Sequence, residues 1–447
     1  MMGLDTHTGN RRTILLAKNI IVSFFLKGWS AAVVLLMVPL TLKCLGVYQN
    51  GVWLTISSML VWIDQMDIGL GNGLRNKLAT YVAQGDMERA RQVVSSTFAF
   101  LTVLIIPVLL ILLWLIWQAD VYTFLNVDVD IIPQLRVALL SAVTLVCMTF
   151  IFKFIGNVYM GMQMPAATNL INVVGQTLAL AGTWLLFITD RADFLAVVTV
   201  NTVAPLLVYI MAYPYTFYWK YPDLKPSIAC VNLNSALGLA NLGIKFFWIQ
   251  IASVIQFLTT NILISKFFTP EMVTPYQVAY RYMSLMLVFF TVVCMPFWNA
   301  TTDAYTRNDM QWITWANRKM SRLSLFIFIA LAIMTLLSPW VYEVWIGDRH
   351  LVPFGMTCAV AAYIFLLVLS MRYSYFLNGV GAMRLQLYMT ASAVVFIPLA
   401  WIVCKFTHDI LWFLAVMCLC NLPGLVVNVI QFNKILNGKA TGIWRIR

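Results

Sequence analysis

Long apolar runs separated by short polar breaks dominate this chain of 447 residues. A membrane-spanning helix needs about 20 consecutive apolar residues, and these runs lack the alternation of a membrane β-strand. We therefore expect an all-α polytopic membrane protein with about twelve transmembrane helices. The predicted spans are 19–45, 52–70, 93–117, 136–157, 169–189, 194–215, 240–266, 274–298, 323–345, 353–377, 385–406 and 410–432.

A polar break near the middle of the chain divides the predicted spans into two sets of six. Breaks at 72–92 and 304–322 each follow the second span of a set, and they contain the similar stretches Tyr81–Met87 and Tyr305–Met310. Many transporter folds are built from such internal repeats. We expect two pseudo-symmetric six-helix bundles and assign the remaining parts of the chain around them. These parts are an amino-terminal segment 1–18, a first bundle 19–215, a linker 216–239, a second bundle 240–432 and a basic tail 433–447.

Composition strengthens the membrane assignment, because 62% of the residues are hydrophobic, only 10% are charged and the mean hydropathy is +0.85. Soluble domains carry roughly 25% charged residues. The net charge is +12, and the charged residues are dispersed among the polar breaks. We therefore attribute this charge to the excess of basic residues in the cytoplasmic loops of membrane proteins rather than to a nucleic-acid-binding surface. The basic residues concentrate in the breaks that lie on the same side of the membrane as the amino terminus. An even number of spans places both termini on that side, so we expect both termini in the cytoplasm.

Known catalytic patterns are missing from the sequence. It contains no glycine-rich phosphate loop, its three histidines lie in predicted loops or termini, and most of its eight cysteines lie within apolar runs. We expect no enzyme active site, no metal site, no cofactor and no disulfide.

Ionisable side chains within apolar spans mark the candidate site, because each costs about 2.5–3.5 kcal/mol to insert. Ser23 and Ser30 lie on the same helix face as Lys27, and Gln250 and Ser253 add polar positions to the seventh span. We predict a cavity whose cations attract an anionic headgroup. For three of them, Lys153, Lys245 and Arg372, snorkelling to the membrane surface is an equal alternative. The predicted cationic residues are Lys27, Lys153, Lys245, Arg281 and Arg372.

Two acidic residues near the end of the second span could gate transport. Asp64 and Asp67 are three residues apart and therefore lie near one helix face, and one interpretation of this pair is a proton- or sodium-sensitive gate. Alternatively, Asp67 orders the glycine-rich break 69–73 and pairs with Arg75.

This break carries a family resemblance. Residues 67–78, followed by Tyr81 and Gly85–Asp86, together with Pro39 in the first span, resemble Wzx-type O-antigen and polysaccharide flippases. That family belongs to the MOP superfamily, which also contains the MATE exporters and the lipid II flippase. The resemblance implies alternating access in a bacterial inner membrane. The implied substrate is an undecaprenyl-pyrophosphate-linked oligosaccharide, with Lys27 and Arg281 near its headgroup. Membrane lipids, a coupling proton or sodium ion and polysaccharide polymerase machinery are the other implied partners.

Two other functions compete with this interpretation. A MATE-type exporter of small organic cations should have acids as its main buried charges, whereas this sequence has more bases. A membrane glycan polymerase or ligase should carry a large outward loop, but the longest one here, 118–135, is short. No residue in the sequence indicates which glycan is carried.

Overall fold

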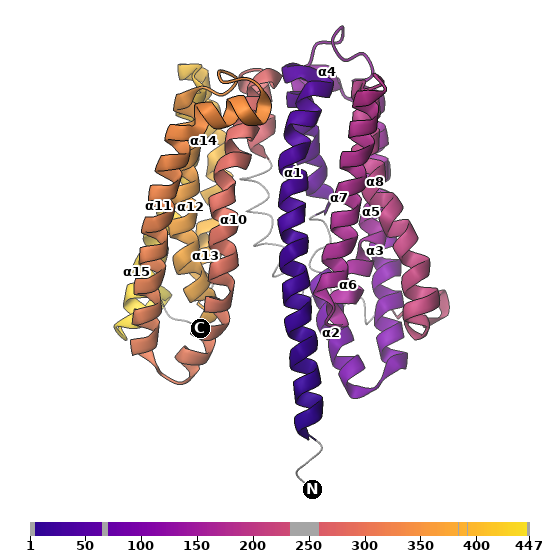
Figure 1. Ribbon diagram of the computed structural model, residues 1–447, viewed down its shortest axis with the longest axis vertical. Helices are drawn as coiled ribbons and strands as arrows, with labels where there is room; N and C mark the ends of the chain where they lie inside the picture. The colour runs from indigo at the N-terminus through magenta and orange to yellow at the C-terminus, as the bar shows by residue number, and fades with distance from the viewer. Residues whose placement is uncertain (1–4, 65–69, 233–258, 383, 391, 445–447) are drawn as a thin grey trace. The chain divides into compact units, whose positions relative to one another are not determined.

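The computed structural model describes residues 5–64, 70–232, 259–382, 384–390 and 392–444 (Figure 1). All regular elements in these ranges are helices. Nine helices in the described part of the chain are long and apolar enough to cross a membrane. The prediction of an all-α polytopic membrane protein is confirmed. Two predicted spans share helix α1, most of 240–266 lies outside the described residues, and 385–406 forms two shorter helices.

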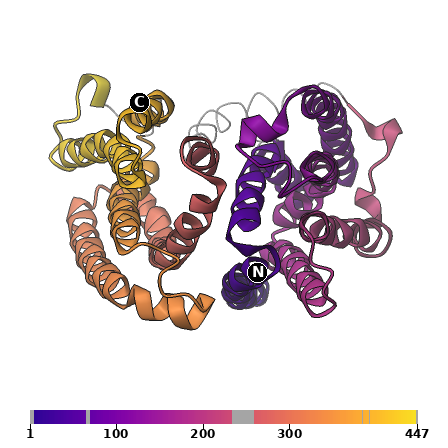
Figure 2. The same ribbon diagram turned by 90° about the horizontal axis from the view of Figure 1, so that it is seen from above.

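The chain divides into two compact units, Met1–Phe247 (unit 1) and Trp248–Arg447 (unit 2). In unit 1, α7 packs against α8 and α1, and α5 packs against α8 and α3. The helices of unit 1 run roughly alongside one another in Figure 1 and are seen end-on in Figure 2. The helices of unit 1 are α1 (Asp5–Asp64), α2 (Leu70–Gln84), α3 (Met87–Gln118), α4 (Val121–Leu125), α5 (Leu135–Phe152), α6 (Phe154–Gly161), α7 (Pro165–Ile188), α8 (Phe194–Pro214), the π-helix η1 (Tyr215–Lys220) and the 3-10 turns η2 (Pro222–Leu224) and η3 (Ile228–Cys230).

Unit 2 is built around α12, which packs against both α10 and α15. Its described part begins with helical residues at 259–267. The helices that follow are α10 (Pro270–Thr306), α11 (Met310–Ile346), α12 (Phe354–Gly379), α13 (Arg384–Thr390), α14 (Ser392–Thr407), α15 (Ile410–Leu436) and the 3-10 turn η4 (Gly442–Trp444).

A kink at Gly46 divides α1, at the point where the sequence predicts a break between the first two spans. Gly46 has φ 68° and ψ 178°, a conformation that is essentially restricted to glycine. The two predicted spans are therefore two helical segments that meet at this residue.

The repeat seen in the sequence forms the same turn in each unit. Asp86 and Asp309 both cap the helix that follows, with the carboxylate accepting the backbone N–H of Arg89 or Trp312 at 2.9 Å. The preceding residue, Gly85 or Asn308, has positive φ in each case. Two segments far apart in the chain thus end one helix and start the next in the same way.

The polar breaks predicted at 72–92 and 304–322 are mostly helical in the structure. In the first, α2 buries Leu70, Leu74 and Leu78 completely, and these residues recur every fourth position. In the second, α10 continues to Thr306 and α11 begins at Met310. These helical segments are too polar to be recognised as membrane spans, so hydropathy alone does not detect them.

Candidate functional site

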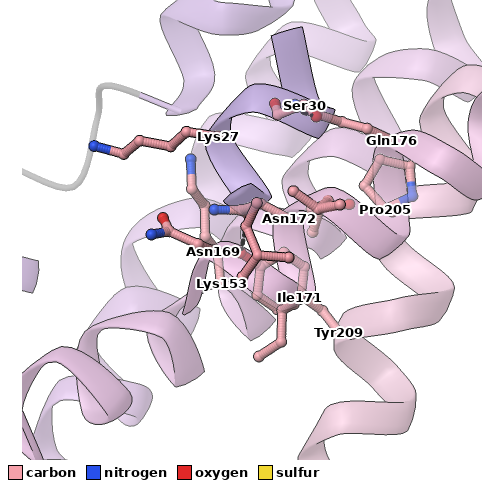
Figure 3. A pocket seen from close by; sticks show the side chains of 13 residues that line it. Lys27, Ser30, Lys153, Asn169, Ile171, Asn172, Gln176, Pro205 and Tyr209 are labelled. Carbon is pink, nitrogen blue, oxygen red and sulfur yellow. Dashed lines mark hydrogen bonds between the residues drawn. The ribbon is translucent and has the colours of Figure 1, made fainter. Parts of the chain in front are cut away.

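A pocket of about 410 Å³ lies within unit 1 and is lined by α1, α7, α8 and the junction of α5 with α6 (Figure 3). We call it the lysine pocket, because Lys27 and Lys153 both line it. Its volume lies within the usual range of about 300–1,000 Å³ for small-molecule sites. The lining residues are Leu26, Lys27, Ser30, Thr149, Lys153, Asn169, Ile171, Asn172, Val173, Gly175, Gln176, Pro205 and Tyr209.

Helix α7 supplies the amide groups of the pocket. Asn169, Asn172 and Gln176 are separated by three and four residues, which places them on one helix face. This polar face lies on an otherwise apolar helix that is long enough to span the membrane. Polar groups at such positions are expensive unless they face protein or a water-filled cavity, so the stripe is well suited to line a binding site.

Two hydrogen bonds between helices fix the orientation of these amides. Ser30 Oγ donates to Gln176 Oε1 at 2.6 Å, and Tyr209 Oη donates to Asn172 Oδ1 at 2.8 Å. Because both amide oxygens already accept a hydrogen bond, what these side chains offer a ligand is chiefly their N–H donors. Hydrogen bonds of this kind hold a site in its binding geometry before the ligand arrives.

A close approach of α7 and α8 forms the back of the pocket. Gly175 is buried, and a Cβ atom at this position would lie 3.2 Å from the Pro205 Cα atom. Small residues allow membrane helices to approach closely and pack without help from the hydrophobic effect. The glycine thus brings the α8 side chain Tyr209 within hydrogen-bonding distance of Asn172.

The pocket carries positive charge. Lys27 lies on α1 and is exposed, whereas Lys153 is partly buried at the interruption between α5 and α6. Figure 3 shows these two lysines on one side of the pocket and the Ser30–Gln176 pair on the other. The lining, which consists entirely of described residues, contains no carboxylate. Two lysines line a space that also holds amide N–H donors, and Figure 3 shows Lys27 extending outward from it. Positive charge beside low-dielectric walls favours an anionic ligand.

The structure brings together three of the residues selected from the sequence and places two others in unit 2. Lys27, Ser30 and Lys153 line the lysine pocket. Arg372 lies in a separate, smaller pocket of unit 2, and Arg281 lies on α10, where its carbonyl accepts a hydrogen bond from Ser284 Oγ at 3.0 Å. The positions that lie outside the described residues are Asp67, Lys245, Gln250 and Ser253, together with the side chains of Ser23 and Asp64.

Sequence reasoning missed the α7 and α8 side of the site. Asn169, Asn172, Gln176 and Tyr209 were not selected, although all four line the pocket. Their signal was present, since three amides at helical spacing within a predicted span form a polar stripe. A search restricted to ionisable residues passes over neutral amides.

Comparison with known proteins identifies the fold. No family model and no curated protein sequence matches the chain. Among solved structures, the inward-facing conformation of a multidrug resistance MATE family transporter of the MOP superfamily is similar, with a TM-score of 0.73 at 15% identity, over 94% of this chain and 96% of that one. A MATE structure in complex with MaD3S gives a TM-score of 0.59 at 15% identity, over 93% and 96%.

A third similar structure is a MOP superfamily transporter from Pyrococcus furiosus, with a TM-score of 0.57 at 15% identity, over 92% of this chain and 96% of that one. That protein is described by a reversed polarity of its binding pocket, which suggests a different function for it. At these identities the likeness establishes the fold. The chain has the fold of MATE transporters of the MOP superfamily along nearly its whole length.

Proposed function

We propose that this protein is a flippase that moves an undecaprenyl-pyrophosphate-linked oligosaccharide from the cytoplasmic to the periplasmic leaflet of a bacterial inner membrane by alternating access. The observation that carries the proposal is the lysine pocket. It combines Lys27 and Lys153 with amide and hydroxyl groups and has no carboxylate among its lining residues. The transporter fold supports alternating access. The resemblance of residues 67–78 to polysaccharide flippases supports a lipid-linked substrate.

Each part of the pocket has a role in this proposal. The ammonium groups of Lys27 and Lys153 attract the pyrophosphate, since unit charges 4 Å apart interact with about 4 kcal/mol at an effective dielectric constant of 20. The amide N–H groups of Asn169, Asn172 and Gln176 donate hydrogen bonds to phosphate or sugar oxygens. The polyprenyl tail remains in the bilayer. Both termini lie in the cytoplasm, where the substrate is loaded.

Other roles in the proposal rest on the sequence alone. Lys245 and Arg281 are further candidates for headgroup contacts, with Ser23, Gln250 and Ser253 as polar lining. Arg372, selected with them from the sequence, lines a pocket of about 30 Å³ and is left out of the headgroup site. Asp64 and Asp67 are candidates for coupling to a proton or sodium ion. A polysaccharide polymerase that uses the flipped lipid is the proposed partner.

The alternative is a MATE-type exporter of small organic molecules, which the structural likeness favours. The two functions differ in the charge that the pocket must accept. A site for organic cations requires a carboxylate or an aromatic cage close to the ligand. The lysine pocket contains one tyrosine and two lysines. We therefore rank the anionic substrate first.

Complementation tests the proposal. Bacterial strains that lack their own O-antigen or capsule flippase would be made to express this chain. A strain whose glycan is compatible with the protein should regain its surface polysaccharide. Lys27→Glu should reduce export about 100-fold or more, because placing a carboxylate beside a pyrophosphate costs about 3 kcal/mol. Lys43→Glu makes the same charge change on the same helix at an exposed position that does not line the pocket, and it should export normally.

Both variants must be present in the membrane at wild-type levels, as checked by immunoblot. Normal export by Lys27→Glu would refute the role of the lysine pocket. Drug efflux by the wild type, together with failure to complement in several glycan backgrounds, would favour the exporter.

A further inference from the structure

A second pocket, far smaller than the first, lies inside unit 2. Its volume is about 30 Å³, and it is lined by α10, α11, α12 and α15. A space of this size holds one particle of the size of a water molecule and excludes a pyrophosphate. We call it the arginine pocket. Its lining residues are Cys294, Phe297, Thr301, Ile313, Ala316, Asn317, Met320, Arg372, Tyr375, Phe376 and Phe432.

The guanidinium of Arg372 is held in a fixed position beside this space. Its Nε and Nη2 atoms both donate to Asn317 Oδ1, at 2.9 and 2.7 Å, and Nη2 also reaches the Asn317 carbonyl at 3.3 Å. The ring of Tyr373 lies 4.8 Å from the guanidinium carbon. The amide of Asn317 satisfies hydrogen bonds but carries no charge. The positive charge of Arg372 therefore stays uncompensated by these contacts.

No carboxylate of unit 2 is placed to compensate that charge. All six acidic residues of Trp248–Arg447 are described, and every one is exposed; none lines the pocket. A cation within a membrane-spanning helix usually pairs with an acid or with backbone carbonyls, because an isolated charge is expensive there. Arg372 has the long contact of 3.3 Å with the Asn317 carbonyl, which leaves its charge without a counter-ion among the described residues of unit 2. The six acidic residues are Glu271, Asp303, Asp309, Glu343, Asp348 and Asp409.

We propose that the arginine pocket binds one small monovalent anion, with chloride as the physiological ligand. The anion would accept hydrogen bonds from the guanidinium of Arg372, and the hydroxyl groups of Thr301 and Tyr375 in the lining are available as further donors. It would neutralise Arg372 and connect α12, which carries Arg372 and Tyr375, with α10, which carries Thr301. This inference concerns a structural ion and is independent of which substrate the lysine pocket carries.

Anion exchange tests the proposal on the purified full-length protein in detergent. At constant ionic strength and pH, chloride and bromide should raise the unfolding temperature relative to gluconate, which is too large for the pocket. Above the dissociation constant, each tenfold rise in chloride should add about 1.5 °C. Arg372→Gln should lose this dependence. Arg318→Gln removes an exposed arginine next to Asn317 on α11 and should keep the full dependence.

A second measurement covers the case in which Arg372→Gln does not fold. Crystals of the wild-type protein grown in bromide should give an anomalous peak within hydrogen-bonding distance of the Arg372 guanidinium. Equal unfolding temperatures in chloride and gluconate, or the absence of an anomalous peak at this position, would overturn the proposal. A halide effect that persists in a folded Arg372→Gln protein would overturn it as well.

Discussion

The two pockets of this protein place the same charge in different settings. In unit 1, Lys27 and Lys153 stand beside about 410 Å³ of space, with amides held by neighbouring helices. In unit 2, Arg372 stands beside about 30 Å³, and a single asparagine holds it in place. Flexible ammonium groups in a large polar space can follow a substrate that enters and leaves. A fixed guanidinium in a small space is suited to an ion that stays.

The difference shows that cations within membrane helices need not share one role. Sequence reasoning grouped Lys27, Lys153 and Arg372 into one headgroup site, because all three are basic and lie within predicted spans. The volume of the pocket and the polar partner of each cation separate them. The sharpest test of this comparison is the coupling energy between the hydrogen-bonded side chains of each pocket, measured without a ligand.

The largest coupling should be found in the arginine pocket. A double-mutant cycle of Arg372→Ala and Asn317→Ala, measured as free energies of unfolding in bicelles, should give about 2 kcal/mol, because hydrogen bonds to charged groups contribute about 1.5–3 kcal/mol. Asn317→Ala combined with Arg318→Ala is the control and should show no coupling, since Arg318 is exposed. A coupling between Arg372 and Asn317 as small as that between Asn317 and Arg318 would contradict the claim that Asn317 holds the guanidinium in a fixed position.

The lysine pocket should show a smaller coupling. Ser30→Ala and Gln176→Ala should couple by about 0.6 kcal/mol, the average for hydrogen bonds between membrane helices. Ser57 serves as the control on α1, because its hydroxyl donates to the Trp53 carbonyl of its own helix at 2.8 Å. Ser57→Ala with Gln176→Ala should be additive. If the Ser30–Gln176 coupling equals or exceeds that of Arg372–Asn317, the distinction between an adaptable pocket and a fixed one fails.

The sequence was sufficient for the features that depend on local composition. Apolar runs predicted the spans, and the break between the first two spans coincides with the kink at Gly46. The resemblance between Asp86 and Asp309 predicted a repeat, and both residues cap a helix in the same turn. These features are recognisable because helix capping and apolar length are encoded within a few neighbouring residues.

Other features depend on contacts between distant segments. Helix α2 lies largely within a predicted polar break, because its leucines recur every fourth position among polar residues and form no apolar run. The amides of Asn172 and Gln176 are oriented by hydrogen bonds from Tyr209 on α8 and Ser30 on α1. Likewise, nothing in the sequence around Arg372 indicates that Asn317, on another helix, holds it. Such pairings become visible only once the helices are packed.

Direct binding tests the central claim that the lysine pocket selects an anionic lipid headgroup. The protein in nanodiscs would be titrated with undecaprenyl pyrophosphate, with uncharged undecaprenol and with the organic cation ethidium. The account predicts that the wild type and Lys43→Glu bind the pyrophosphate lipid at least about 10-fold more tightly than undecaprenol, a difference of about 1.4 kcal/mol. Lys27→Glu and Lys153→Glu should lose this preference. Equal affinity of the wild type for the two lipids, or tighter binding of ethidium, would contradict the account.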